Sequence, residues 1–181
     1  MAITIAEPWL SFLREVDGAL AKPVEVHCLG GFVLSVLWGL PRPTGDVDVV
    51  EVAPKASANG LLAIAGAGSD LSARYHLQFH LVTVAEYPEN YASRLVDISP
   101  PEFRHLRLGA FEAHDLALAK LSRNSQRDRE DVAFLVERGV LDKRILQKRF
   151  DEELQPYLLN PERETTTLEL WIDEFFPVGN P

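Results

Sequence analysis

The sequence is poor in the residues that mark secreted, zinc-binding and membrane proteins. It contains a single cysteine, Cys28, which excludes an internal disulfide framework and a cysteine zinc cluster. No apolar run approaches the roughly 20 residues of a membrane span, and no basic-then-apolar leader opens the chain. We therefore expect a cytoplasmic protein without a membrane segment, in which Cys28 is a buried and inert thiol.

Basic residues are also in short supply. The 18 Lys and Arg residues face 27 Asp and Glu residues, and the net charge is −9. A nonspecific nucleic-acid binder needs clustered Lys and Arg to neutralise phosphates, so we expect no DNA partner, although residues 94–129 hold enough arginines for a local basic face. With 46% hydrophobic and 25% charged residues, the 181-residue chain has the composition of a soluble domain with a real core.

What the sequence does have is a clear division into a mixed front part and a helical back part. Alternating patterns predict strands at 24–29, 46–52, 79–84, 95–98 and 106–110. Helical spacing predicts helices at 7–20 and 32–38, one helix within 54–75, and then 112–122, 126–138, 142–154 and 164–176. The expected fold class is α+β: a small mixed sheet flanked by helices in residues 1–110, with a helical C-terminal segment, 111–181, packing on it.

Two glycines, Gly30 and Gly31, lie between the first predicted strand and the following helix. The first N–H groups of a helix have no intrahelical partner and form an anion site suited to phosphates. Glycine allows phosphate oxygens to approach the backbone closely. The alternative is a plain strand-to-helix turn without a ligand.

Asp46 and Asp48 lie two apart on the next predicted strand, so both side chains leave the same face. Two carboxylates at this separation suit Mg²⁺, with Mn²⁺ as the alternative ion. Arg42 and Thr44 lie just upstream, where they can contact phosphate. A solvated strand face is the simpler interpretation, but Asp is depleted in strands, so the pair favours a metal-dependent nucleotide site.

The motif from Leu29-Gly-Gly-Phe32 to Arg42-Pro-Thr-Gly-Asp-Val-Asp48 resembles the signature of the nucleotidyltransferase superfamily in its minimal form. The resemblance implies an NTP with its triphosphate on the glycine turn and its Mg²⁺ on the two aspartates. It also implies transfer of the NMP to a hydroxyl of an RNA (tRNA) or of a protein, with release of pyrophosphate.

The segments Asp115-Leu-Ala-Leu-Ala-Lys120 and Arg127-Asp-Arg-Glu-Asp131 are similar to a region of bacterial nucleotidyltransferase-like proteins, including AbiE-type and MenT-type toxins. This similarity implies that Lys120 contacts phosphate, that Asp128 lies near the catalytic site, and that an antitoxin protein is a partner. The alternatives are an ordinary surface lysine at Lys120 and a structural ion pair of Asp131 with Arg127.

One acid that the superfamily uses has no evident counterpart here. Its catalysts carry a third carboxylate on a later strand, whereas the matching strand 79–84 offers His80 and Thr83; Glu86 and Asp97 are the acids nearest in sequence. Two alternatives to an active enzyme therefore stay open. One is a binding module that holds a nucleotide without turnover, and the other is an antitoxin-like or oligomerising partner protein.

Overall fold

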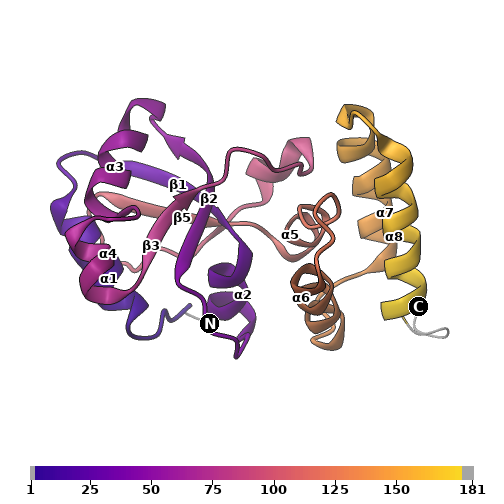
Figure 1. The fold of residues 1–181 in the computed structure, drawn as a ribbon, viewed down its shortest axis with the longest axis horizontal. Coiled ribbons are helices and arrows are strands. Elements are labelled where there is room, and N and C mark those ends of the chain that lie inside the picture. Colours follow the sequence, from indigo (N-terminus) through magenta and orange to yellow (C-terminus); the bar gives the residue numbers. More distant parts are fainter. Residues whose placement is uncertain (1–2, 177–181) are drawn as a thin grey trace. The chain divides into compact units, whose positions relative to one another are not determined.

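The computed structural model describes residues 3–176, which form two compact units. The first unit comprises residues 3–83 and 95–111 and holds the strands; the second comprises residues 84–94 and 112–176 and is helical (Figure 1). Residues 84–94, which the sequence places with the front part, thus group with the C-terminal helices.

The first unit is built on one mixed sheet. Its strands are β1 (Val24–Leu29), β2 (Asp46–Ala53), β3 (Gln78–Leu81), β4 (Val96–Asp97) and β5 (Leu106–Ala110), in the order β3-β2-β1-β5-β4. β1 pairs antiparallel with β2 and parallel with β5, while β3 runs parallel to β2. The predicted α+β class with a small mixed sheet is confirmed.

β2 contains a bulge close to its middle. Opposite β1, His27 faces Glu51 and Cys28 faces Val49, so that Val50 is skipped. The buried residues of β2 are consequently Val47 and Val49, which are two residues apart, and then Val52, which follows three residues after Val49. A bulge inserts one residue and bends its strand, which is why the predicted strict alternation over 46–52 holds only for its first four residues, where both aspartates lie.

Helices α1 (Trp9–Ala19) and α2 (Gly30–Trp38) occur where the sequence predicts them. Ring contacts of Phe12 with Trp9, Tyr75 and Phe79, and of Trp9 with Phe32, join both helices to β3 in one aromatic core. Phe12, Phe32 and Phe79 are buried, and burying each of these three rings stabilises the fold by roughly 1.5–3 kcal/mol.

The prediction of a single helix within 54–75 is wrong. A 3₁₀ turn (Lys55–Ser57) leads into α3 (Ala58–Ala65), and a second helix, α4 (Asp70–Tyr75), follows. Ser69 caps α4 by accepting a hydrogen bond from the N–H of Ser72 at 3.1 Å, so the segment read as irregular contains a capped helix start.

β3 is shorter than predicted and ends at Leu81. Its last ladder contact is the hydrogen bond from Val82 N–H to the carbonyl of Val49. Val84, at the predicted end of this strand, is 90% exposed and belongs to the second unit. The strand predicted over 95–98 is likewise reduced to the two residues of β4.

A buried carboxylate holds α1 against the start of β5. Asp17 accepts hydrogen bonds from the backbone N–H groups of Arg104, His105 and Leu106, with N···O distances of 2.7–3.1 Å. Burial by itself would raise the pKa of Asp17, but the three N–H donors outweigh it and lower the pKa below its ordinary value of 3.8. The ionised form is therefore the one that stabilises the fold.

We expect Asp17→Asn to lower stability at neutral pH by about 1–2 kcal/mol, because hydrogen bonds to a charged acceptor are stronger than those to an amide. Since folding lowers the pKa, the Asp17 contribution is complete above pH 3.8 and is lost as the pH falls through the folded value. Thermal unfolding between pH 3 and 7 should show that the difference between wild type and variant shrinks in acid. Asp173→Asn, on the exposed side of a C-terminal helix, is the control, and a difference that stays constant with pH would contradict this role.

The second unit contains α5 (Ala113–Leu118), α6 (Gln126–Glu137), α7 (Lys143–Arg149), a π-helical turn (Phe150–Leu154), a 3₁₀ turn (Gln155–Tyr157) and α8 (Pro161–Phe175). Arg94, at the end of the 3₁₀ segment Glu89–Arg94, donates to the buried Asp115 at 2.8 and 3.0 Å and to Glu153 at 2.7 Å. Arg149 joins the network through Asp115 at 3.0 Å. These bonds explain why residues 84–94 pack with the helices.

Two observations concern the predicted environment of the chain. No helix between residues 3 and 176 combines the length and apolarity needed to cross a membrane. Cys28 is fully buried, as predicted, and burial followed by the negative charge of Asp48 raises the pKa of its thiol. A thiol with a raised pKa is a poor nucleophile.

Candidate functional site

The two aspartates of β2 leave the same face of the strand, and each is paired with a residue of β3. In the parallel register Asp46 lies beside Gln78 and Asp48 beside His80. Gln78 Nε2 donates to Asp46 Oδ1 at 2.8 Å, and His80 Nδ1 lies 2.8 Å from Asp48 Oδ1. Because an ionised carboxylate only accepts, His80 Nδ1 is the donor.

The other oxygen of Asp48 faces the start of α2. A Cβ built on Gly30 would lie 2.6 Å from Asp48 Oδ2, and Gly30 has φ +80°. Glycine is therefore required here for two reasons: the left-handed backbone and the close approach of the carboxylate. The sequence analysis explains the glycine by the close approach of a phosphate ligand. In the structure the group that approaches Gly30 is the carboxylate of Asp48.

The connection before β2 covers the second glycine. A Cβ on Gly31 would lie 3.3 Å from Cβ and Oγ1 of Thr44. Arg42 lies two residues earlier on the same connection and is half-buried. The residue before α2, Leu29, provides no side-chain cap for this nine-residue helix, and Asp48 and Thr44 are the neighbours of its first two residues.

The donor set fits a divalent cation that takes part of its shell from a substrate. Asp46 Oδ2 and Asp48 Oδ2 accept no hydrogen bond from any residue in the described part of the chain. Within residues 3–176 no group of three or more His, Cys, Asp or Glu side chains is arranged to hold a metal. Mg²⁺ is commonly bound by one or two carboxylates together with phosphates and waters. Asp46 and Asp48 provide two such carboxylates.

Neither acid considered as the third carboxylate lies on a strand that pairs with β2. Asp97 is on β4, which β1 and β5 separate from β2 in the sheet order, and it accepts from the N–H of Ser99. Glu86 belongs to the second unit, where it accepts from Ser122. On β3 the side chains beside the two aspartates are Gln78, which the sequence-based reasoning did not single out, and His80.

Lys120 and Asp128 come together in the second unit. Lys120 is buried, and its Nζ lies 2.7 Å from Asp131 and 3.4 Å from Asp128. The surface-lysine interpretation is therefore wrong. Asp128 is the N3 residue of a capping box with Ser125 and also accepts from Arg123 at 2.6 and 2.7 Å. Burial would raise the pKa of Asp128, but Arg123, Ser125 and Lys120 outweigh it and lower the pKa.

These contacts give Lys120 and Asp128 a structural role that the sequence did not indicate. The contact of Lys120 with phosphate and the catalytic role of Asp128 stay predictions.

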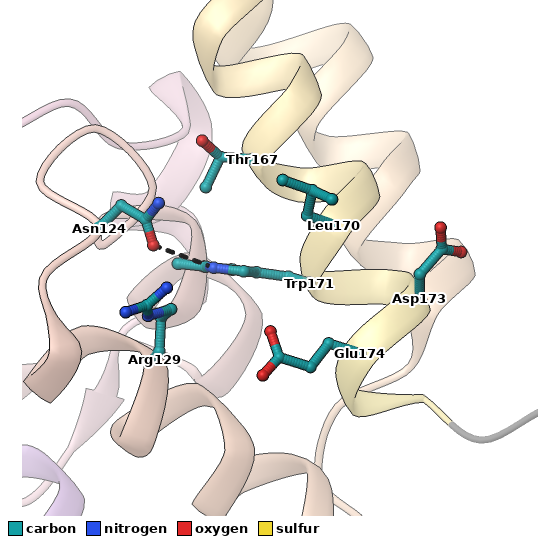
Figure 2. A pocket seen from close by; sticks show the side chains of 7 residues that line it. All are labelled: Asn124, Arg129, Thr167, Leu170, Trp171, Asp173 and Glu174. Carbon is teal, nitrogen blue, oxygen red and sulfur yellow. Dashed lines mark hydrogen bonds between the residues drawn. The ribbon is translucent and has the colours of Figure 1, made fainter.

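A hollow of about 340 Å³ lies elsewhere in the second unit, between α6 and α8. The indole of Trp171 reaches from α8 toward Asn124, whose Oδ1 accepts its Nε1–H at 3.2 Å (Figure 2). Arg129 and Glu174 also line the hollow. It includes none of the predicted site residues.

The chain was also compared with known proteins. Residues 12–176 match the model of a family described as "Nucleotidyltransferase of unknown function (DUF6036)". No curated protein matches, and no solved structure matches. The family match spans both units and includes the glycine turn, Asp46 and Asp48. The chain therefore belongs to this family of nucleotidyltransferases of unknown function.

Proposed function

We propose that this protein is a metal-dependent nucleotidyltransferase that moves an NMP from an NTP to a hydroxyl group. The observation that carries the proposal is the placement of Asp46 and Asp48 on one face of β2, with Asp48 Oδ2 directed at the glycine start of α2. Carboxylates beside uncapped helix N–H groups offer a cation site and an anion site side by side, which is what a metal-bound triphosphate requires.

In this reaction the residues around the glycine turn bind the phosphates of the NTP. The N–H groups at Gly30 and Gly31 and the side chains of Thr44 and Arg42 bind phosphate oxygens. The acceptor oxygen forms a bond to the α-phosphorus while the bond from that phosphorus to the bridging oxygen breaks. Pyrophosphate leaves with the electron pair, and the hydroxyl proton passes to solvent. The phosphate contact predicted for Lys120 belongs to the same proposal, although Asp131 pairs its ammonium in the free protein.

Asp46 and Asp48 would hold Mg²⁺, or Mn²⁺ in its place. The ion would neutralise charge on the transferring phosphates. The two carboxylates carry a charge of −2, which one divalent cation balances. The acceptor is proposed to be tRNA or a protein hydroxyl, with growth arrest and an antitoxin partner as the biological setting of such a transfer.

The direct test incubates the purified protein with labelled NTPs, Mg²⁺, and either total tRNA or total cell protein. We expect Asp46→Asn and Asp48→Asn each to reduce label transfer about 100-fold or more, because metal stabilisation of phosphate charge amounts to several kcal/mol and about 1.4 kcal/mol is a factor of ten. Glu51→Gln removes the same charge from the same strand beyond the bulge and should retain wild-type transfer. Equal transfer by all three variants would refute the proposal.

A second candidate is a module that binds a metal–nucleotide complex without turnover. His80, rather than an acid, beside Asp48 is the observation that favours it. Mg²⁺-dependent nucleotide binding that Asp48→Asn abolishes, together with no transfer to either acceptor pool, would establish this candidate instead.

A further inference from the structure

We propose that Gln78 and His80 are positioning residues, each of which fixes one oxygen of a β2 aspartate so that the other oxygen is presented to the metal. The inference rests on the proposed function and deepens it, because it assigns the arrangement of the metal site to a second strand. Neither residue is a metal ligand in this proposal.

The strand pairing supplies the geometry. β2 and β3 run parallel with Asp46 beside Gln78 and Asp48 beside His80, so both pairs lie on one face at the same spacing. Each β3 side chain donates to the Oδ1 atom of its partner, at 2.8 Å in both cases. Two equivalent bonds in register restrict the rotation of both carboxylates about their side-chain torsions.

The remaining oxygens are the ones available for a cation. Asp48 Oδ2 points at the start of α2, where a Cβ on Gly30 would meet it at 2.6 Å. Rotating this carboxylate by a quarter turn would take one oxygen away from His80 and the other away from the start of α2, and the bond to His80 disfavours that rotation. Metal-ligating groups are commonly oriented by such outer hydrogen bonds, and loss of one typically weakens metal binding 10- to 100-fold.

Fold stability does not explain the His80–Asp48 contact. The His80 side chain is 58% exposed and that of Asp48 is 30% exposed, and pairs so accessible to water contribute little to folding. The contact therefore orders the carboxylate rather than the fold. Metal affinity should respond to its loss while thermal stability should not, which separates positioning from a structural role.

The atom that matters at His80 is Nδ1, and three substitutions test it. In His80→Asn the side-chain amide nitrogen lies near the position of Nδ1, so the donor to Asp48 is kept. In His80→Gln the amide nitrogen lies near the position of Nε2, and in His80→Leu the donor is absent. For Asp46, Gln78→Met keeps the length of the side chain without its donor.

The experiment titrates each full-length protein with Mn²⁺ alone and follows the EPR signal of the free ion, with thermal unfolding measured in parallel. We expect His80→Leu, His80→Gln and Gln78→Met to bind Mn²⁺ about 10- to 100-fold more weakly than wild type, and the two His80 variants to keep the wild-type unfolding temperature. His80→Asn should bind like wild type.

The outcomes separate this inference from the proposed function. Wild-type affinity in both His80→Leu and Gln78→Met would overturn the positioning role while leaving the metal site in place. Weak binding by His80→Asn with retention by His80→Gln would overturn it as well, since it would make Nε2 a direct ligand. If wild type binds no Mn²⁺, or if Asp48→Asn binds as wild type does, the metal site itself fails and the inference falls with it.

Discussion

Replacing Lys120 by methionine is expected to lower the free energy of unfolding by about 3–5 kcal/mol, the usual cost of removing one partner from a buried ion pair. The Lys120 ammonium lies 2.7 Å from Asp131 and 3.4 Å from Asp128. Both carboxylates are at most 2% exposed. Asp128 retains Arg123 and Ser125 as donors, so most of the loss comes from breaking the buried 2.7 Å contact between Lys120 and Asp131.

Two further variants make this expectation specific, with urea denaturation as the measurement. Lys148→Met removes a lysine from an exposed position on α7 and should change stability by less than about 0.5 kcal/mol. The double variant Lys120→Met with Asp131→Leu removes both charges together and should recover most of the loss, because replacing a buried pair by apolar groups is often neutral. If Lys120→Met is as stable as Lys148→Met, the buried pair does not contribute as described.

The same double variant decides the predicted role of Lys120 toward phosphate. It is expected to fold without the lysine, so its label transfer reports on chemistry rather than on stability. Transfer near the wild-type level would make the lysine a structural residue of the second unit. Transfer that falls while the fold stays intact would support the phosphate contact implied by the family resemblance.

The strand–helix–strand segment that carries the two aspartates was predictable because its signals are local. Period-two alternation, the glycine pair and the acidic residues all lie between Val24 and Ala53, and each depends on neighbours within a few residues. The second helix of 54–75 was missed although a local signal existed. Ser69-Asp70 is a helix N-terminal pattern, which the surrounding glycines obscured.

The contacts of the site residues could not be read from the sequence, because they depend on pairing between distant segments. His80 and Asp48 are 32 residues apart in the sequence, and only the parallel register of β2 and β3 brings them into contact. Hydrophobic pattern fixes which face of a strand is buried, but it does not say which residue of another strand lies alongside. Lys120 presents the same difficulty, since the helical pattern places it beside an apolar face and its acidic partners follow on the next helix, α6.

Gly30→Ala is the substitution that tests the glycine turn most directly, and Gly39→Ala is its matched control at the other end of α2. Both glycines have positive φ, +80° and +71°, so alanine should cost about 1–2 kcal/mol of backbone strain at either position. Only at Gly30 does the new Cβ meet another group, Asp48 Oδ2 at 2.6 Å; at Gly39 nothing lies within 4 Å.

The two variants should therefore lose similar backbone stability and differ in function. Gly30→Ala forces the Asp48 carboxylate to move, and a displacement on the order of 1 Å in a catalytic group costs about 100-fold in rate. We expect that loss in NMP transfer, together with weaker Mn²⁺ binding and a further destabilisation of about 1–3 kcal/mol from overpacking, whereas Gly39→Ala should keep wild-type transfer. If both variants transfer label equally well, Asp48 does not act from the position beside Gly30, and the cation and anion sites are not neighbours in the working protein.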